Sequence, residues 1–196
     1  MEHSGYSTPW IRACSILLFA LLVTACTDSQ PQLKRVPTAS KIVAFGDSLT
    51  FGTGAKAPES YPAQLQILIS RTVIRSGVPG EVSSAGLERL LGVLEEHAPA
   101  LVLLCHGGND LLRKKGPAGA DANLRAMVKL IRASGAEVVL LGVPKPGLLL
   151  SPASHYDRIA EDLHIPYLRD SLSDILGERD LKSDTVHPNA AGYRQL

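Results

Sequence analysis

Short apolar runs alternate with longer amphipathic stretches along most of this 196-residue chain. The runs resemble buried strands, whereas the stretches repeat apolar residues at spacings of three and four, as helices do. One such stripe is formed by Leu87, Leu90, Leu91 and Leu94. The expected strands are residues 42–45, 72–75, 101–105, 138–143 and 165–168. The expected helices are residues 61–71, 85–97, 120–133 and 154–163, and a final helix opens within residues 189–196.

This alternation predicts the fold class. Near-continuous apolar strands separated by amphipathic helices require a parallel sheet that is covered on both faces and connected by right-handed crossovers. We therefore expect an α/β fold, a flavodoxin-like three-layer α/β/α domain with a five-stranded parallel sheet.

The first 40 residues differ from the rest of the chain. Arg12 precedes an apolar run, residues 13–25, which is short for a membrane span but typical of a signal-peptide core. The run ends on Val-Thr-Ala-Cys26, which is similar to a bacterial lipobox, whose cysteine receives diacylglycerol and becomes the mature N-terminus. An uncleaved anchor or an ordinary secretory signal is the alternative. We expect a lipoprotein signal peptide at 1–25, a polar tether at 26–40 and a folded domain at 41–196.

Lipidation of Cys26 would make the membrane a partner of this chain. In lipoproteins of two-membrane bacteria an aspartate after the cysteine usually retains the protein at the inner membrane, and Thr27 stands there instead. We therefore expect a lipid-anchored protein of the cell envelope, on the periplasmic face of the outer membrane. Cys14 lies in the signal and Cys105 is then alone, so we expect a buried thiol and no disulfide.

Composition and charge exclude several function classes. Twenty Lys and Arg residues face nineteen Asp and Glu residues, which leaves a formal net charge of +1 and no electrostatic reason to bind nucleic acid. The sequence has no His-Glu-x-x-His, no paired cysteine spacing and no carboxylate cluster, so we expect no metal. Residues 45–54 are glycine-rich but lack the Gly-Lys-Ser/Thr of a phosphate loop, so we expect no nucleotide and no other cofactor.

The first expected strand leads directly into Gly46-Asp47-Ser48. A serine at the carboxyl end of a strand lies where open α/β folds bind their ligands. Asp184-Thr185-Val186-His187 supplies an imidazole that can act as its base and a carboxylate that can orient the imidazole. We expect Ser48 to be the nucleophile, with a helix N-cap as the alternative role. Asp47 is expected to anchor the turn through backbone hydrogen bonds.

Two glycine-containing segments follow other apolar runs. They are Gly77-Val78-Pro79-Gly80 and Gly107-Gly108-Asn109-Asp110. Gly80 can offer a backbone N–H, with a positive φ if the turn requires one, and Asn109 can offer a side-chain amide to a developing oxyanion. Taken alone, Gly-Asn-Asp favours a turn role for Asn109, and only its place among the other segments favours the oxyanion role.

These four segments, in this order, resemble the SGNH/GDSL hydrolase family, and most closely its bacterial lysophospholipase, thioesterase and arylesterase branch. The resemblance runs from about Lys41 to the C-terminus. It maps the four residues of the family name onto Ser48, Gly80, Asn109 and His187, with Asp184 as the third triad member. It also implies a three-donor oxyanion hole completed by the Ser48 N–H, and strand order 2-1-3-4-5.

The chain departs from the family in two places. Arg75 and Ser76 stand where relatives often carry Asn and Ala, and Pro79 precedes Gly80, so this loop keeps the glycine of the family pattern but not the residues around it. Relatives also carry a longer final helix than residues 189–196 allow, which suggests a shortened product or fragment.

The resemblance implies a serine hydrolase that cleaves carboxylic esters or thioesters through an acyl-Ser48 intermediate. The substrate would be a small acyl ester or a lysophospholipid-like molecule. Leu111, Leu112 and the loop 147–150, with Leu148, are expected to line an acyl groove, or else simply to pack between loops. The rival functions are a carbohydrate O-deacetylase of the same fold and a non-catalytic envelope lipoprotein that binds lipid or protein. A complete catalytic set argues against the second.

Overall fold

The computed structural model describes Met1 and residues 31–114, 116–145, 147 and 150–196. The expected signal peptide, the lipidation site Cys26 and the groove residue Leu148 lie outside these residues. Residues 31–40, the described part of the expected tether, form neither helix nor strand. No helix within the described ranges combines the length and the apolar character that crossing a bilayer requires.

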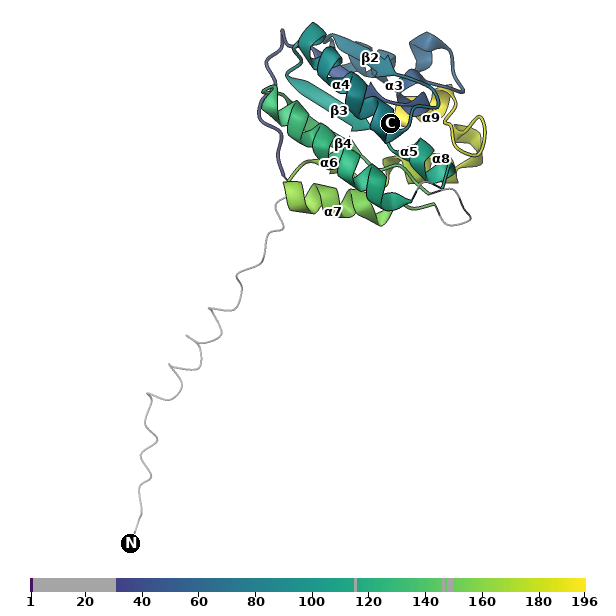
Figure 1. Cartoon of the computed structure of the whole chain (residues 1–196). Coiled ribbons are helices and arrows are strands. Elements are labelled where there is room, and N and C mark those ends of the chain that lie inside the picture. Colours follow the sequence, from purple (N-terminus) through teal and green to yellow (C-terminus); the bar gives the residue numbers. More distant parts are fainter. Residues whose placement is uncertain (2–30, 115, 146, 148–149) are drawn as a thin grey trace. The chain divides into compact units, whose positions relative to one another are not determined.

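Five parallel strands form the central sheet in the order β2-β1-β3-β4-β5, so the predicted strand order is confirmed (Figure 1). Gly46 at the end of β1 is level with Gly77 of β2 and with Cys105 of β3. The three loops that follow these strands therefore start side by side at one edge of the sheet. The strands are β1 (Ile42–Gly46), β2 (Val73–Gly77), β3 (Leu101–Cys105), β4 (Glu137–Leu141) and β5 (Tyr167–Leu168).

Helices cover both faces of the sheet and confirm the three-layer architecture. Over one face α4 (Ser83–His97) contacts α6 (Pro117–Ala133), which contacts α7 (Ser154–Leu163) (Figure 1). On the other side α3 (Tyr61–Ile69) contacts α9 (Ala190–Gln195), and α9 contacts α8 (Ser171–Gly177). Two short helices, α2 (Ser48–Phe51) and α5 (Gly108–Leu112), begin in the loops after β1 and β3.

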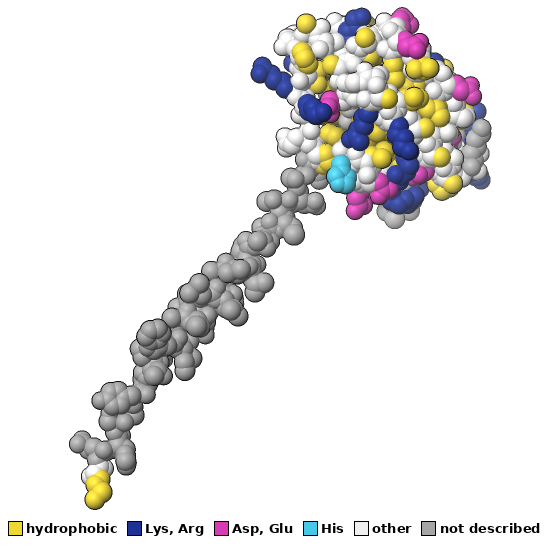
Figure 2. Space-filling model, turned by 60° about the vertical axis from the view of Figure 1, so that its left-hand side comes forward, with side chains coloured by type: hydrophobic (Ala, Val, Ile, Leu, Met, Phe, Trp, Pro, Cys, Tyr) yellow, Lys and Arg dark blue, Asp and Glu magenta, His cyan; other side chains and the backbone are white. Residues whose placement is uncertain are grey.

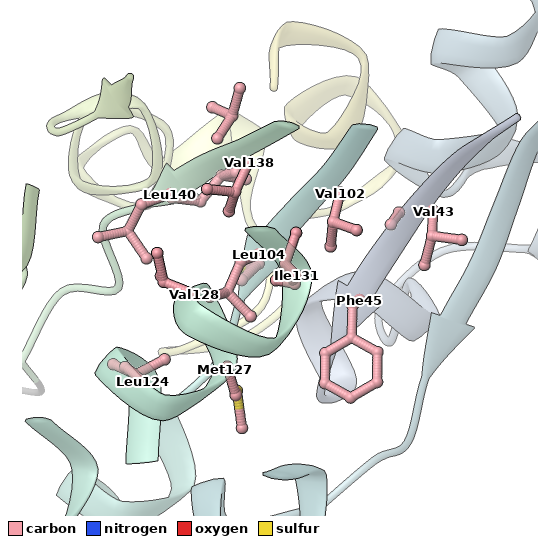
Figure 3. Packing of buried hydrophobic residues seen from close by; sticks show 14 of the residues in the cluster. Val43, Phe45, Val102, Leu104, Leu124, Met127, Val128, Ile131, Val138 and Leu140 are labelled. Atoms are coloured by element: carbon pink, nitrogen blue, oxygen red, sulfur yellow. The ribbon is translucent and has the colours of Figure 1, made fainter. Parts of the chain in front are cut away.

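The core shows why the strand sequences are almost continuously apolar. Alternate residues of β1, β3 and β4, among them Val43, Val102 and Val138, lie on the side of α6 (Figure 3). Most of the intervening residues are buried too, with Leu103 only partly so. Apolar side chains of α6 close the first face, and all of them are fully buried: Leu124, Met127, Val128 and Ile131. The opposite face keeps a groove of about 440 Å³ between α3, the sheet and the end of α9.

The surface carries charges of both signs. Lys and Arg side chains lie among Asp and Glu side chains on the face seen in Figure 2, with hydrophobic side chains scattered between them. This mixture agrees with the formal net charge of +1.

Three helices were not expected from the sequence. Helices α2 and α5 have four and five residues, too few for a periodic pattern. Helix α8 does carry one, because Leu172, Ile175 and Leu176 recur at spacings of three and four and are buried. The expected fourth and fifth strands are shorter in the structure, since β4 ends at Leu141 and β5 keeps only two residues.

Candidate active site

The nucleophile candidate lies at the start of α2. Strand β1 ends at Gly46, where a Cβ would overlap the carbonyl oxygen of Cys105, so the close approach of the two chains requires glycine. Asp47 is the N-cap of α2, and its Oδ1 accepts a hydrogen bond from the Leu49 N–H at 3.1 Å. The predicted anchoring role of Asp47 is confirmed. The alternative that Ser48 caps the helix is wrong, because Ser48 is its first residue.

Residues from opposite ends of the chain form a continuous hydrogen-bonded series. His187 Nε2 lies 3.0 Å from Ser48 Oγ, and His187 Nδ1 lies 2.8 Å from Asp184 Oδ2. A carboxylate can only accept, so Nδ1 carries the proton and Nε2 is left to accept the Ser48 hydroxyl hydrogen. The structure thus brings together the serine, histidine and aspartate that the sequence analysis singled out, in an arrangement that can generate a serine nucleophile.

The loop before α9 fixes the aspartate and the histidine. Asp184 Oδ1 accepts hydrogen bonds from the N–H groups of Val186 at 2.8 Å and His187 at 2.9 Å. The Ser183 N–H closes the loop on the His187 carbonyl at 2.9 Å. Partial burial raises the pKa of Asp184, but the hydrogen bonds from the His187 ring and the two N–H groups outweigh it, so the pKa lies below its ordinary value. The carboxylate stays ionised beside the imidazole.

Gly80 adopts the left-handed conformation, with φ at 77°. A Cβ there would meet no atom closer than 3.7 Å, so the backbone conformation, and not crowding, explains this glycine. The Arg113 guanidinium donates a hydrogen bond to the Gly80 carbonyl at 2.8 Å and holds the loop. Among the described residues, the N–H groups of Gly80 and Ser48 have no protein acceptor. Both are therefore available to a substrate oxygen.

Asn109 lies in the first turn of α5, and its side chain joins two other loops. Its Nδ2 donates to Asp47 Oδ2 at 3.1 Å and to the Glu81 carbonyl at 3.0 Å. The next residue, Asp110, accepts hydrogen bonds from the N–H and the hydroxyl of Ser83 at 2.8 and 2.9 Å. The amide of Asn109 and the hydroxyl of Ser48 line the same cavity.

The cavity beside Ser48 and His187 is mainly apolar. Leu112, which is 47% exposed, lines it as expected. The expectation that Leu111 also lines this cavity is wrong. Adjacent residues of a helix point in different directions, and Leu111 packs against the hydrophobic core instead. The sequence analysis missed most of the other lining residues, because they come from the loop after β4, from α8 and from the histidine loop. These are Val143, Pro144, Lys145, Leu176, Thr185 and Val186, and Leu150 belongs to the expected loop.

Two other groups complete the chemical inventory. Cys105 is fully buried, as expected, and burial raises the pKa of its thiol, so it is no competing nucleophile. In the parts of the chain that the structure describes, no cluster of three His, Cys, Asp or Glu side chains is placed to hold a metal ion.

Comparisons with known proteins agree with this geometry. The model of the GDSL-like lipase/acylhydrolase family matches residues 44–195. Esterase TesA from Pseudomonas aeruginosa is 29% identical over 190 residues, which cover 90% of this chain and 93% of that protein. Thioesterase 1/protease 1/lysophospholipase L1 from Escherichia coli is 29% identical over 163 residues, covering 79% of this chain and 78% of the relative. The crystal structure of the psychrotrophic esterase EstA from Pseudoalteromonas, inhibited by monoethylphosphonate, has a TM-score of 0.71 at 28% identity and covers 79% of this chain and 92% of its own.

Proposed function

The chain belongs to the GDSL-like lipase/acylhydrolase family, and from this premise we propose that Ser48, His187 and Asp184 are its catalytic triad. The family and the relatives make the chain an esterase of the carboxylic ester hydrolase class. The observation that carries the assignment is the unbroken series from Ser48 Oγ through the His187 ring to the Asp184 carboxylate, in which Ser48 and His187 lie 139 positions apart in the sequence.

In the first half of the reaction Ser48 Oγ attacks the acyl carbon while its proton moves to His187 Nε2. The carbonyl oxygen becomes an oxyanion and accepts hydrogen bonds from the N–H of Ser48 and the N–H of Gly80. The amide of Asn109 joins them when the hydrogen that it shares with Asp47 Oδ2 turns to the oxyanion, while its second hydrogen stays on the Glu81 carbonyl. Asp184 stabilises the imidazolium that forms. Collapse of the intermediate breaks the bond to the alcohol or thiol, which leaves with the proton of His187, and the acyl group remains on Ser48.

In the second half water replaces the alcohol. His187 Nε2, neutral again, takes a proton from water as its oxygen attacks the acyl carbon. The same three donors hold the second oxyanion. Its collapse releases the carboxylic acid, and the proton returns from His187 to Ser48 Oγ, which restores the starting state.

The substrate class follows from the cavity and the relatives. Leu112, Leu150 and Leu176 give the cavity an apolar wall next to Ser48, which suits an acyl chain. The names of the relatives include esterase, thioesterase and lysophospholipase. We propose acyl esters, with thioesters and lysophospholipid-like esters as the members of this class to test.

The N-terminal segment suggests where the enzyme acts. The apolar run 13–25 followed by Cys26 supports cleavage before the cysteine and its lipidation. With Thr27 next, we propose a lipid-anchored enzyme on the periplasmic face of the outer membrane of a two-membrane bacterium.

The triad is tested by covalent labelling together with turnover. A fluorophosphonate probe should modify Ser48 of the wild type, as located by mass spectrometry, and should miss Ser48→Ala. The exposed Ser154 provides the control, because Ser154→Ala should label and turn over like the wild type. Rates on p-nitrophenyl esters from acetate to laurate then give the acyl preference. Labelling that persists in Ser48→Ala would place the nucleophile elsewhere.

A further inference from the structure

A largely buried ion pair joins Glu81, the residue after Gly80, to Arg89 of α4. We call residues 78–81, which follow β2, the oxyanion loop. Arg89 of α4 binds the carboxylate of Glu81 with two nitrogens, Nε to Oε1 at 2.9 Å and Nη2 to Oε2 at 2.8 Å. The side chain of Glu81 is 7% exposed and that of Arg89 is 27% exposed. Bidentate geometry of this kind fixes both partners in orientation as well as in distance. Glu81 therefore has a fixed position immediately after Gly80.

The same guanidinium reaches the ends of two strands. It donates to Ser76 Oγ at 2.6 Å, to the Ser76 carbonyl at 3.3 Å and to the Gly46 carbonyl at 3.4 Å. Its carbon lies 4.2 Å from the centroid of the Phe45 ring. Gly46 precedes the nucleophile turn and Ser76 precedes the oxyanion loop, so one side chain ties both loops to α4.

His106 brings the third loop to the same carboxylate. Its Nε2 lies 3.1 Å from Glu81 Oε2, and its Nδ1 accepts the Gly107 N–H at 2.9 Å. Both contacts are satisfied by the neutral ring that carries its proton on Nε2. Gly86 of α4 makes room for this ring, because a Cβ there would overlap it. Glu81 is thus the partner of both Arg89 and His106.

Glu81, held in place by Arg89 and His106, is bonded in turn to both candidate oxyanion donors, Gly80 and Asn109. Its main-chain carbonyl accepts the amide of Asn109 at 3.0 Å, and its peptide group adjoins Gly80. Burial raises the pKa of the Glu81 carboxyl, but hydrogen bonds from His106 and Arg89 and the charge of Arg89 lower it to about 2. The carboxylate is thus ionised at any working pH and can hold all its donors.

We propose that Glu81 and Arg89 are positioning residues of the oxyanion hole, which hold Gly80 and Asn109 at the distance that the reaction requires. The proposal rests on the proposed function of Ser48, Gly80 and Asn109. Neither Glu81 nor Arg89 lines the cavity beside Ser48. Misplacement of a donor by a fraction of an ångström weakens it in the transition state, so the loss appears in kcat.

The experiment compares kcat, KM and thermal melting of full-chain variants on p-nitrophenyl butyrate. Glu81→Gln keeps the size of the side chain but loses the charge that Arg89 binds, and kcat should fall by about tenfold or more with KM within about twofold. Arg89→Met removes the other partner of the ion pair and should likewise lower kcat with little change in KM. Arg89→Lys keeps the charge without the planar fork and should lie between Arg89→Met and the wild type.

A matched control separates positioning from general stability. Arg125 also binds two carboxylates, Asp121 at 2.7 Å and Asp162 at 2.8 Å, and is 25% exposed, but it lies on α6 away from the cavity. Arg125→Met should keep kcat within about twofold even where its melting temperature falls. If Arg89→Met does not fold, Ser76→Ala removes a single bond of the same guanidinium and replaces it in the comparison.

The second test is whether the kcat losses of Glu81→Gln and Asn109→Ala combine independently in the double variant. If Glu81 acts through Asn109 and Gly80, Glu81→Gln should lower kcat by a smaller factor in Asn109→Ala than in the wild type, because one of the two donors that it positions is already gone. The proposal is overturned if Glu81→Gln and Ser76→Ala turn over like the wild type per folded molecule, or if the losses of Glu81→Gln and Asn109→Ala multiply. An active Ser48→Ala would instead refute the proposed function, so the two failures are distinguishable.

Discussion

The side-chain nitrogen of Asn109 lies 3.1 Å from Asp47 Oδ2, so the Gly-Asn-Asp segment is bonded to the residue immediately before Ser48, the proposed nucleophile. The other oxygen of Asp47 caps α2 through the Leu49 N–H. One buried carboxylate thus sets the positions of Ser48 and of a candidate oxyanion donor. Burial raises the pKa of Asp47, although the hydrogen bonds from the Leu49 N–H and the Asn109 amide oppose this. Its oxygens are committed to these donors, which separates Asp47 from the triad.

Asn109→Ala should lower kcat by roughly 10² to 10³, with little change in KM, because the amide meets its strongest acceptor only when the oxyanion forms. Steady-state kinetics beside a thermal melt checks this. A residue that only shaped the turn would behave differently: the protein would melt earlier while kcat per folded molecule stayed near the wild-type value.

Ser48→Ala and His187→Ala should each lower kcat by at least about 10³-fold, and the double variant should be little worse than either single one, because the two residues act as a unit. Steady-state kinetics on a p-nitrophenyl ester, expressed per molecule of folded protein, measures all three. Losses that multiplied in the double variant would mean that His187 and Ser48 work in separate steps.

The sequence predicted the sheet well because its strands are buried on both faces and therefore read as uninterrupted apolar runs. The third strand, residues 101–105, and helix 154–163 have the predicted limits. Helices α2 and α5 were missed because four or five residues hold no full period of a helix. The two-residue strand β5 pairs only with the last residues of β4, a limit set by tertiary packing.

The residues of the proposed triad were predictable from the sequence, whereas the residues around them were not. Ser48 and His187 stand in local motifs, so their chemistry is visible in the sequence. Glu81, Arg89 and His106 resemble ordinary charged residues of a loop, a helix and a strand end, and only the alignment of Gly46, Gly77 and Cys105 at the sheet edge brings their segments together. Which of two adjacent leucines faces the cavity likewise depended on the orientation of α5.

Leu112→Ala should weaken the binding of long acyl chains and spare short ones. Leu112 is about half exposed on the cavity wall, so its removal should cost about 1 kcal/mol of apolar contact, or about a fivefold rise in KM for octanoate, with acetate nearly unchanged. Leu91, 51% exposed on α4, gives the matched control Leu91→Ala. Equal changes for acetate and octanoate would remove Leu112 from the acyl wall.

Cys26→Ser should move the protein from the membrane fraction to the periplasmic extract, because the lipid would be its main attachment to the bilayer. Immunoblots of fractionated cells measure the distribution, and Cys14→Ala, within the expected signal core, should leave it unchanged. A Cys26→Ser protein that remained in the membrane fraction would argue for an uncleaved anchor.

Acid should destabilise the wild type more steeply than Glu81→Gln. The pKa of Glu81 is about 2 in the folded protein against an ordinary value of 4.5, so the unfolded chain binds more protons between these values. The contribution of the carboxylate to the free energy of unfolding, at most about 3 kcal/mol, is complete above pH 4.5 and is lost as the pH falls towards 2. Asp184, whose pKa is lowered, and Asp47, whose pKa is raised, are present in both proteins. The effect of each on stability therefore cancels when the free energy of unfolding of Glu81→Gln is subtracted from that of the wild type. Urea unfolding of both proteins at pH 6, 5, 4 and 3 should therefore give stability curves that run parallel above pH 5 and converge below pH 4.5. Curves that stayed parallel down to pH 3 would mean that the fold does not favour the ionised form of Glu81.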